Sequence, residues 1–211
     1  MPERVIILGA GGHAKVIAET LRMNPDYEIL GCLSEKGIYY IGGRLRVIGD
    51  DTLLPTLYKD GVRQVVIGIG DNRVRHERAN AVRHLGFSLL NVIHPTAYVS
   101  ESVTLGSGVV IMANTVVNTD TRIDDNTIIN TGTTVDHDCV IEDSCHIAPG
   151  CTLSGGVRVG AGTWLGTGTS VIDHISIGAW SVIGAGAVVV TDLPSDCIAY
   201  GVPARVQRSL K

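Results

Sequence analysis

Aromatic residues are scarce in this chain. They make up 4% of the 211 residues, with one Phe and two Trp, although hydrophobic residues account for 45%. Such a balance is expected where a narrow, repeated interior admits only Val, Ile and Leu. The 26 glycines indicate frequent tight turns, because glycine adopts backbone conformations that other residues avoid.

The chain also lacks an excess of positive charge, long apolar runs and closely paired cysteines. The 17 Lys and Arg are scattered and outnumbered by 21 Asp and Glu, so the basic surface of a nucleic-acid binder is not expected. No apolar run approaches the roughly eighteen residues of a membrane span, and the segment before Gly9 lacks the hydrophobic region of a signal peptide. We therefore expect a cytoplasmic protein that binds neither nucleic acid nor membrane. Five cysteines without a CxxC pair indicate reduced thiols rather than a disulfide framework or a zinc site.

What the chain does contain is a six-residue repeat. Every sixth residue from Ile93 to Val189 is aliphatic, without a break. The position two residues earlier often holds a small or β-branched residue, and the position one residue later is often Gly, Asn or Asp, which tolerate tight turns. A chain that turns every six residues and buries one aliphatic side chain per segment is typical of a hexapeptide parallel β-helix. The aliphatic residues are Ile93, Val99, Leu105, Ile111, Val117, Ile123, Ile129, Val135, Ile141, Ile147, Leu153, Val159, Leu165, Val171, Ile177, Ile183 and Val189.

The coil length follows from known hexapeptide proteins, which place three hexads in each coil. The repeat would then make roughly five to six coils, stacked about 4.8 Å apart. Residues eighteen apart would stack on one face, and residues nine apart would lie half a coil from each other. We expect this domain to span residues 94–211, including a C-terminal tail in which the repeat ends near Asp192.

Residues 1–93 alternate strands and helices instead. This alternation predicts a small parallel sheet with helices on both faces, a Rossmann-like α/β domain that binds ligands at the carboxyl ends of its strands. The predicted strands are 4–8, 27–33, 64–69 and 88–93, and the predicted helices are 14–23, 51–59 and 73–85.

A glycine turn follows the first predicted strand. Gly9-x-Gly11-x-x-Ala14 nearly matches the dinucleotide fingerprint, and Glu35 lies at the distance expected of a ribose-binding acid. Because residues 1–93 suffice for only half of a dinucleotide fold, one nucleotide diphosphate is the expected ligand. A turn that only lets the helix pack closely on the sheet would leave the same pattern.

His137 is the candidate general base. It is flanked by Asp136 and Asp138, and a carboxylate beside an imidazole raises its basicity and fixes its tautomer. Asp136 occupies the expected turn position, which leaves Asp138, with no turn role, as the better orienting partner. His146 lies nine residues further, half a coil around, so it is not expected beside His137 within one subunit. A zinc site formed by these histidines and His174 is disfavoured, because they lack close paired spacing.

Five segments together resemble the nucleotide-sugar N-acetyltransferases of the bacillosamine and perosamine type, a group that also includes sialic-acid O-acetyltransferase-like proteins. The resemblance covers essentially the whole chain. The segments are Gly9 to His13, Gly70-Asp71-Asn72, Asn130-Thr131-Gly132, Asp136-His137-Asp138-Cys139 and Gly201-Val202-Pro203-Ala204.

This resemblance implies a homotrimer of left-handed β-helices with active sites between subunits, acetyl-CoA as co-substrate and no metal. It also implies that the N-terminal domain holds a nucleotide-linked 4-amino-4,6-dideoxy sugar, and that His137 is the catalytic base with Asp138 as the acid that tunes it. The implied contacts to the nucleotide sugar are Gly11, Gly12, His13, Ser34, Glu35, Gly70, Asn72 and Asn130, and those to acetyl-CoA are His146, Gly155, Thr167 and Pro203. Many relatives carry two acids after the second strand, where this chain has Ser34-Glu35, so the recognised base stays open.

The expected reaction is direct acetyl transfer from acetyl-CoA to an amine. A neutral imidazole accepts the amine proton near pH 7, a fixed N–H donor stabilises the oxyanion, and no nucleophilic Cys or Ser is required. Two other functions stay open: an O-acetyltransferase acting on a sugar or sialic-acid hydroxyl, and a non-catalytic trimer that only binds a nucleotide sugar.

Overall fold

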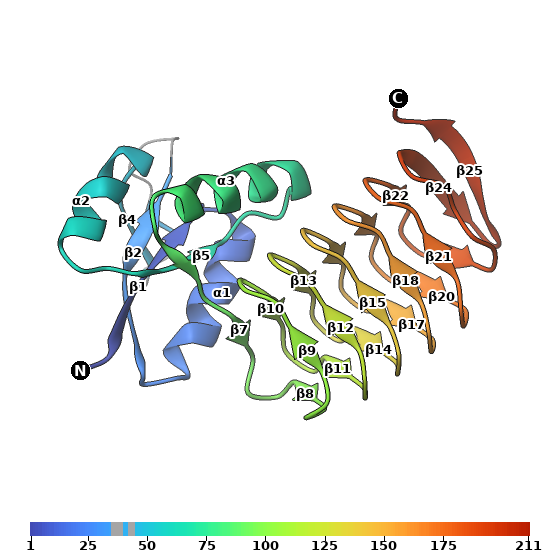
Figure 1. The fold of residues 1–211 in the computed structure, drawn as a ribbon, viewed down its shortest axis with the longest axis horizontal. Coiled ribbons are helices and arrows are strands. Elements are labelled where there is room, and N and C mark those ends of the chain that lie inside the picture. Colours follow the sequence, from blue (N-terminus) through green and yellow to red (C-terminus); the bar gives the residue numbers. More distant parts are fainter. Residues whose placement is uncertain (35–39, 42–44) are drawn as a thin grey trace. The chain divides into compact units, whose positions relative to one another are not determined.

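The computed structural model describes residues 1–34, 40–41 and 45–211, without the side chains of 40 and 41. The chain divides into two compact units, Met1–Val92 and Ile93–Lys211 (Figure 1). This division lies one residue before the expected boundary between residues 93 and 94.

The first unit is built on a six-stranded sheet with the order β3-β4-β2-β1-β5-β6. Its pairs are parallel except for β3 with β4. The sequence did not predict β3 and β4, and the last predicted strand is divided, because 88–89 pair within this sheet while 92–93 join the β-helix. The strands are β1 (Glu3–Leu8), β2 (Tyr27–Leu33), β3 (Tyr40–Ile41), β4 (Leu45–Gly49), β5 (Gln64–Ile67) and β6 (Ser88–Leu89).

Helices cover both faces of this sheet, as predicted. Alternate residues of β1 face opposite sides: Ile6 packs in a cluster with Leu54 of α2 and Val82 of α3, whereas Ile7 lies with Ala14 of α1 against Gly68. Figure 1 shows α1 on one side of the sheet and α2 and α3 on the other. The helices are α1 (Gly12–Arg22), the 3-10 turn η1 (Asp51–Leu53), α2 (Leu54–Lys59) and α3 (Asn72–His84).

The second unit is a parallel β-helix whose coils have three faces, and from β7 to β23 each face is a ladder of two-residue strands stacked eighteen residues apart. Face 1 holds β7 (Val92–Ile93), β10 (Val110–Ile111), β13 (Ile128–Ile129), β16 (His146–Ile147), β19 (Trp164–Leu165), β22 (Val182–Ile183), β24 (Cys197–Gly201) and β25 (Ala204–Ser209). Face 2 holds β8 (Tyr98–Val99), β11 (Val116–Val117), β14 (Thr134–Val135), β17 (Thr152–Leu153), β20 (Ser170–Val171) and β23 (Val188–Val189). Face 3 holds β9 (Thr104–Leu105), β12 (Arg122–Ile123), β15 (Val140–Ile141), β18 (Arg158–Val159) and β21 (Ser176–Ile177).

The aliphatic residues of the repeat form the core of this unit. Those from Ile111 to Val189 are buried, which confirms the six-residue assignment. The exception is the start of the stack, where Ile93 is 43% exposed, because it lies at the edge of its face with a coil on one side only.

The turn position predicted from the repeat was wrong. The left-handed residue lies three positions after the aliphatic residue, not one, with φ of 59° at Asp120, 60° at Asp138 and 58° at His174. Glycines one position after the aliphatic residue instead permit close stacking of coils. A Cβ on Gly160 would lie 2.5 Å from the backbone nitrogen of Ala179 in the next coil.

Small residues two positions before the aliphatic residue tie successive coils together. Thr127 Oγ1 donates to the carbonyl of Glu142 at 2.9 Å and accepts from the Cys145 N–H at 3.2 Å. Cys145 continues the pattern, since its Sγ donates to the carbonyl of Gly160 at 3.2 Å. All five cysteines are buried thiols outside any disulfide. Cys139, Cys145 and Cys151 occupy repeat positions and donate to carbonyls of the next coil, so these positions reflect hydrogen bonding as well as packing.

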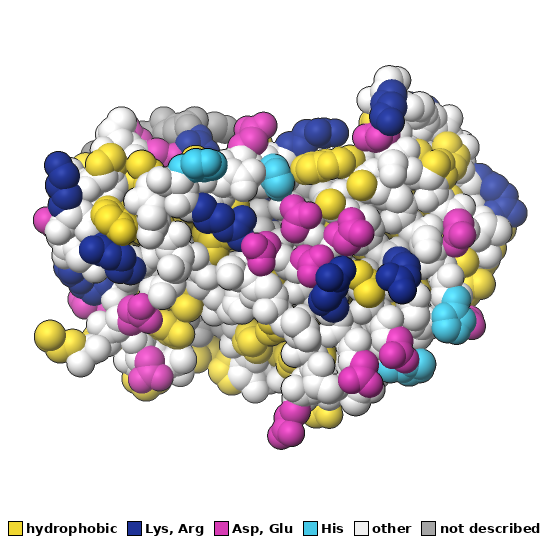
Figure 2. Space-filling model, viewed as in Figure 1, with side chains coloured by type: hydrophobic (Ala, Val, Ile, Leu, Met, Phe, Trp, Pro, Cys, Tyr) yellow, Lys and Arg dark blue, Asp and Glu magenta, His cyan; other side chains and the backbone are white. Residues whose placement is uncertain are grey.

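The chain ends in a hairpin that was expected only as a tail. β24 extends face 1 in parallel with β22, and β25 pairs antiparallel with β24. No helix in the part of the chain described by the structure is both long and apolar enough to cross a membrane. On the surface shown in Figure 2, acidic side chains are interspersed with basic ones.

Candidate active site

His137 and Asp138 lie at the corner between β14 and β15. The Nδ1–H of His137 donates to Asp138 Oδ2 at 2.7 Å, because a carboxylate offers only acceptors. Asp138 occupies the left-handed turn position with φ of 60°, so the expectation that it has no turn role was wrong. Aspartate tolerates this backbone conformation and at the same time places its carboxylate beside the imidazole.

A second carboxylate holds the backbone of the same turn. Asp136 Oδ1 accepts from the His137 N–H at 2.8 Å and from Asn118 Nδ2, one coil below, at 3.0 Å. The hydrogen bond from Asn118, followed by that from His137, lowers the pKa of Asp136. Asn118 was not predicted as a site residue, although its eighteen-residue offset from Asp136 was visible in the repeat.

These carboxylates make His137 a stronger base. The hydrogen bond to Asp138, followed by the negative charge of Asp136, raises the pKa of the imidazole above its usual value. Because Nδ1 carries the proton shared with Asp138, Nε2 is left as the nitrogen that accepts a proton. The side chains of His137 and Asp138 are 56% and 66% exposed in the single chain, so a substrate can reach them.

Gly155 lies in the coil after that of His137 and is covered by the His137 ring. A Cβ built on Gly155 would lie 2.6 Å from His137 Cε1 and 2.8 Å from Nε2, so only glycine leaves the ring in place. The neighbouring Gly156 is covered in the same way by His174, which occupies the left-handed position of the next coil. Among the hydrogen bonds of the described residues, the Gly155 N–H has no acceptor, which is unusual for a buried amide.

Asn130 and His146 form a second polar pair on another side of the coil. Asn130 Oδ1 accepts from the Thr131 N–H at 2.8 Å, which leaves Nδ2 to donate to His146 Nε2 at 3.1 Å. His146 therefore carries its ring proton on Nδ1. His146 lies on face 1 and His137 at the corner between faces 2 and 3, as their nine-residue spacing predicts.

The glycine turn of the α/β unit has two different roles. Gly9 has φ of 103° and lies close to Gly68, so the fold itself requires glycine there. Gly11 and Gly12 lack a positive φ, and a Cβ on either would meet no atom within 4 Å. Close helix packing therefore does not explain these two residues, which are exposed at the N-terminus of α1 beside His13, where a phosphate binds well.

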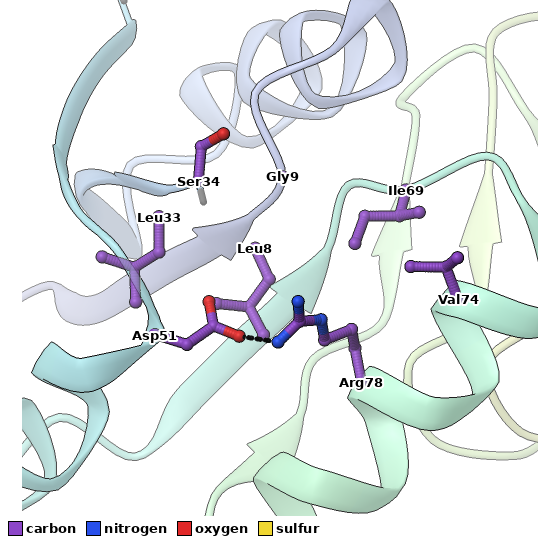
Figure 3. Close-up of a pocket in the computed structure, with 8 residues that line it drawn as sticks. All are labelled: Leu8, Gly9, Leu33, Ser34, Asp51, Ile69, Val74 and Arg78. Carbon is purple, nitrogen blue, oxygen red and sulfur yellow. Dashed lines mark hydrogen bonds and ion pairs between the residues drawn. The ribbon is translucent and has the colours of Figure 1, made fainter. Parts of the chain in front are cut away.

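A cavity of about 180 Å³ opens at the carboxyl ends of β1, β2 and β5 (Figure 3). The chain crosses from one side of β1 to the other between β4 and β5, which makes this edge a topological switch point, where such sheets bind ligands. Ser34 lines the cavity, and so do Asp51 and Arg78, which form an ion pair there and were not predicted. The residues that line it are Leu8, Gly9, Leu33, Ser34, Asp51, Ile69, Val74 and Arg78.

The loop after β5 is held from beneath by a buried arginine. Arg75 is 1% exposed, and its Nη1 donates to the carbonyl of Gly70 at 3.1 Å. Asp71 caps α3 by accepting from the Val74 N–H at 3.0 Å, and Asn72 begins the helix. The structure therefore places Gly70 on a fixed loop and Asn72 at the first position of α3, both at the same edge of the sheet as the cavity.

The remaining predicted residues lie elsewhere. Thr167 lies in the turn after β19, and Pro203 lies in the turn of the β24–β25 hairpin. Glu35 falls outside the described residues. Within the described ranges, no three His, Cys, Asp or Glu side chains are placed to hold a metal ion.

Comparison with known proteins identifies both units. Residues 4–82 match the PglD N-terminal domain, and residues 120–155 match the bacterial transferase hexapeptide repeats. UDP-N-acetylbacillosamine N-acetyltransferase of Bacillus subtilis (strain 168) is 39% identical over 114 residues, which are 53% of this chain and 52% of that protein. The chain thus spans about half the length of this curated relative.

Two solved structures match over nearly the whole chain. A histidine-to-asparagine variant of perosamine N-acetyltransferase from Caulobacter crescentus, in complex with CoA and GDP-perosamine, is 44% identical, with 97% of each chain covered and a TM-score of 0.94. The acetyltransferase domain of PglB from Neisseria gonorrhoeae FA1090, in complex with acetyl coenzyme A, is 37% identical, with 98% of this chain and 100% of that chain covered and a TM-score of 0.92. Both share the α/β unit and the left-handed β-helix. The chain therefore belongs to the nucleotide-sugar N-acetyltransferases, the family of perosamine N-acetyltransferase and the PglB acetyltransferase domain.

Proposed function

We propose that this protein acetylates the amino group of a nucleotide-linked 4-amino-4,6-dideoxy sugar by direct transfer from acetyl-CoA. The observation that carries the proposal is the hydrogen bond from His137 Nδ1 to Asp138, which leaves Nε2 as a strengthened proton acceptor on an accessible corner of the β-helix. The family supplies the class of reaction, and the dyad supplies the group that this reaction needs.

His137 acts as the general base. The amine nitrogen attacks the thioester carbonyl carbon, and His137 Nε2 takes the proton that the nitrogen sheds as the new C–N bond forms. The C–S bond then breaks, and the imidazolium returns the proton to the departing sulfur, so the products are the amide and free CoA. Asp138 stabilises the imidazolium between these steps, as a carboxylate beside a catalytic histidine does.

Gly155 is the candidate donor to the oxyanion. Gly155 lies against the His137 ring, and its N–H lacks an acceptor among the described residues, so an acetyl carbonyl would complete its hydrogen bonding. A fixed N–H that faces developing negative charge lowers the barrier by a few kcal/mol when the site excludes water, roughly 2.7–4 kcal/mol in a measured case. The support for acetyl-CoA at this site is therefore a backbone N–H without an acceptor next to the base.

The α/β unit holds the nucleotide in this proposal. Open space above Gly11 and Gly12 at the α1 N-terminus suits a diphosphate, and the cavity beside Ser34 suits the attached base. The Caulobacter relative is a complex with CoA and GDP-perosamine, which are ligands of the same two kinds.

A homotrimer would bring the two halves of the site together. Within one chain, the pair formed by Asn130 and His146 lies on a different side of the coil from His137, so it reaches an active site beside that residue only from a neighbouring subunit. Two individually inactive variants, His137→Ala and His146→Ala, should then recover activity when mixed and reassembled. A fully active monomer in sedimentation would exclude this arrangement. The cytoplasmic location stays a prediction from the sequence.

The acetyl transfer is tested by measuring CoA release with UDP-, GDP- and dTDP-linked 4-amino sugars, with hydroxyl acceptors as the comparison. We expect release with at least one amine and loss of about 10²–10⁴-fold in kcat for His137→Ala. Release with hydroxyl acceptors alone would indicate an O-acetyltransferase. Binding of a nucleotide sugar without any release would indicate a non-catalytic trimer.

A further inference from the structure

The cavity of the α/β unit combines apolar walls with one ion pair. Leu8, Leu33 and Ile69 contribute apolar surface, and the polar contact within it joins Asp51 to Arg78. Figure 3 shows one carboxylate oxygen of Asp51 in contact with the Arg78 guanidinium and the other directed away from it. The cavity therefore offers a row of hydrogen-bonding groups with an arginine donor at one end and a carboxylate acceptor at the other.

This ion pair stays accessible from the cavity. The Asp51 and Arg78 side chains are 27% and 29% exposed, so a molecule that enters the cavity can reach both. The cavity volume of about 180 Å³ is below the roughly 300–1,000 Å³ of sites that hold a complete drug-sized ligand, so it suits one ring system. A flat ring between the apolar walls would present its edge to the ion pair.

We propose that Asp51 and Arg78 recognise the nucleobase of the nucleotide-sugar substrate and select guanine over uracil and thymine. The inference rests on the proposed function, because that function places the nucleotide in this unit. It addresses a difference among the relatives, whose names include both a GDP-linked and a UDP-linked sugar.

Guanine and the ion pair have matching hydrogen-bonding edges. Guanine presents the O6 acceptor next to two donors, N1–H and the N2 amino group. Arg78 donates to O6, and the two oxygens of Asp51 accept from N1–H and N2–H, so that all three groups are satisfied. Uracil and thymine present a single N–H between two carbonyl oxygens. Their second carbonyl would face the other carboxylate oxygen, two acceptors with no proton between them.

Adenine fits less well than guanine for the same reason. It offers one amino donor and one ring-nitrogen acceptor on this edge, so one oxygen of Asp51 would be left without a donor. The expected order of affinity is therefore guanine first, adenine next, and uracil and thymine last.

Calorimetric titration of the full chain with GDP, ADP, UDP and dTDP tests this order without requiring acetyl transfer. GDP should bind about 10- to 100-fold more tightly than UDP, the range expected for one hydrogen bond to a charged group. Asp51→Asn should reverse this preference, because an amide offers one acceptor and one donor, which match the N–H and carbonyl of uracil but oppose the guanine amino group. Asp50→Asn is the matched control: its side chain caps η1 by accepting from Thr52 N–H at 3.0 Å, and asparagine caps equally well.

The outcomes separate this inference from the proposed function. Equal or tighter binding of UDP by the wild type, or unchanged GDP preference in Asp51→Asn, would overturn the role of the pair while leaving the N-acetyltransferase proposal intact. If the wild type prefers GDP but releases no CoA with any amino sugar, only the N-acetyltransferase proposal is overturned. Should Asp51→Asn prove unfolded in a thermal melt, Arg78→Gln is the second variant, and its GDP affinity should fall toward that of UDP.

Discussion

Replacement of Gly155 by alanine should remove most of the activity and leave the fold intact. The new Cβ would lie 2.6 Å from His137 Cε1, and ordinary contact begins at 3.4 Å, so the ring must retreat by the difference, about 0.8 Å. His137 is a surface side chain and can move, and Gly155 has no left-handed φ that would penalise alanine. The steric conflict is therefore relieved by displacing the base rather than by opening the coil.

The expected size of the effect follows from this displacement. A catalytic group misplaced by about 1 Å costs on the order of 10²-fold in rate, so we expect kcat of Gly155→Ala to fall by about 10²-fold. The loss should be no larger than that of His137→Ala. The melting temperature should stay within about 4 °C of the wild type, the shift that roughly 1 kcal/mol produces in a chain of this length. Steady-state kinetics of CoA release and a thermal melt measure both quantities.

Two controls keep the interpretation specific. Gly184→Ala introduces a comparable conflict, because its Cβ would lie 2.7 Å from Tyr200 Cβ, but at a corner away from the dyad, so its kcat should remain near that of the wild type. The double variant with His137→Ala and Gly155→Ala should be no slower than His137→Ala alone, since the ring through which alanine acts is already absent. A Gly155→Ala enzyme with unchanged kcat would show that the base works from another position.

Three further variants test the supports of the dyad and of the coil. Asp138→Asn keeps a residue that tolerates the left-handed turn but removes the charge, so the pKa of His137 should fall and the acidic limb of the kcat profile should shift to lower pH, since the base works only when unprotonated. An unmoved limb would contradict this pairing. Asn118→Ala releases the carboxylate that holds the His137 N–H, and kcat should fall about 2- to 10-fold at unchanged KM for acetyl-CoA, the worth of one hydrogen bond. Thr127→Val leaves a buried carbonyl and N–H without their hydroxyl partner and should lower the free energy of unfolding by about 1–3 kcal/mol, measured by denaturant titration. Thr127→Cys should lower it less, because a thiol can replace the hydroxyl. Equal losses in the two variants would argue against the thiol as a substitute.

The fold was predictable wherever one residue type repeats for one physical reason. The aliphatic residue in each hexad must be buried, so its period of six survives every change at the surface. β4 and the C-terminal hairpin carry no such repeat. β4 is five residues long and lies at the edge of its parallel ladder, and β25 is held by pairing with β24 rather than by its own pattern.

The candidate site was predictable only as far as the coil geometry reaches. His137 and Asp138 are adjacent, and Asn118 lies one coil below Asp136, so the repeat alone places these residues near one another. Asp51 and Arg78 come from η1 and α3, which no local pattern brings together. Their contact exists because α2 and α3 pack on the same face of the sheet, a consequence of tertiary structure.

The turn of the β-helix limits which residues can serve the base. The position after His137 has a left-handed backbone, which short polar side chains such as Asp and Asn tolerate better than Glu. Gly and Asn would also satisfy the turn, but neither supplies a negative charge. Aspartate meets both demands, because its short carboxylate fits the left-handed backbone and reaches Nδ1 at 2.7 Å. The corresponding turn of the next coil places Gly155 against the ring, so the backbone that closes each coil also positions the base. Structure and chemistry therefore constrain this corner together, which explains how a repetitive scaffold can hold one precise site.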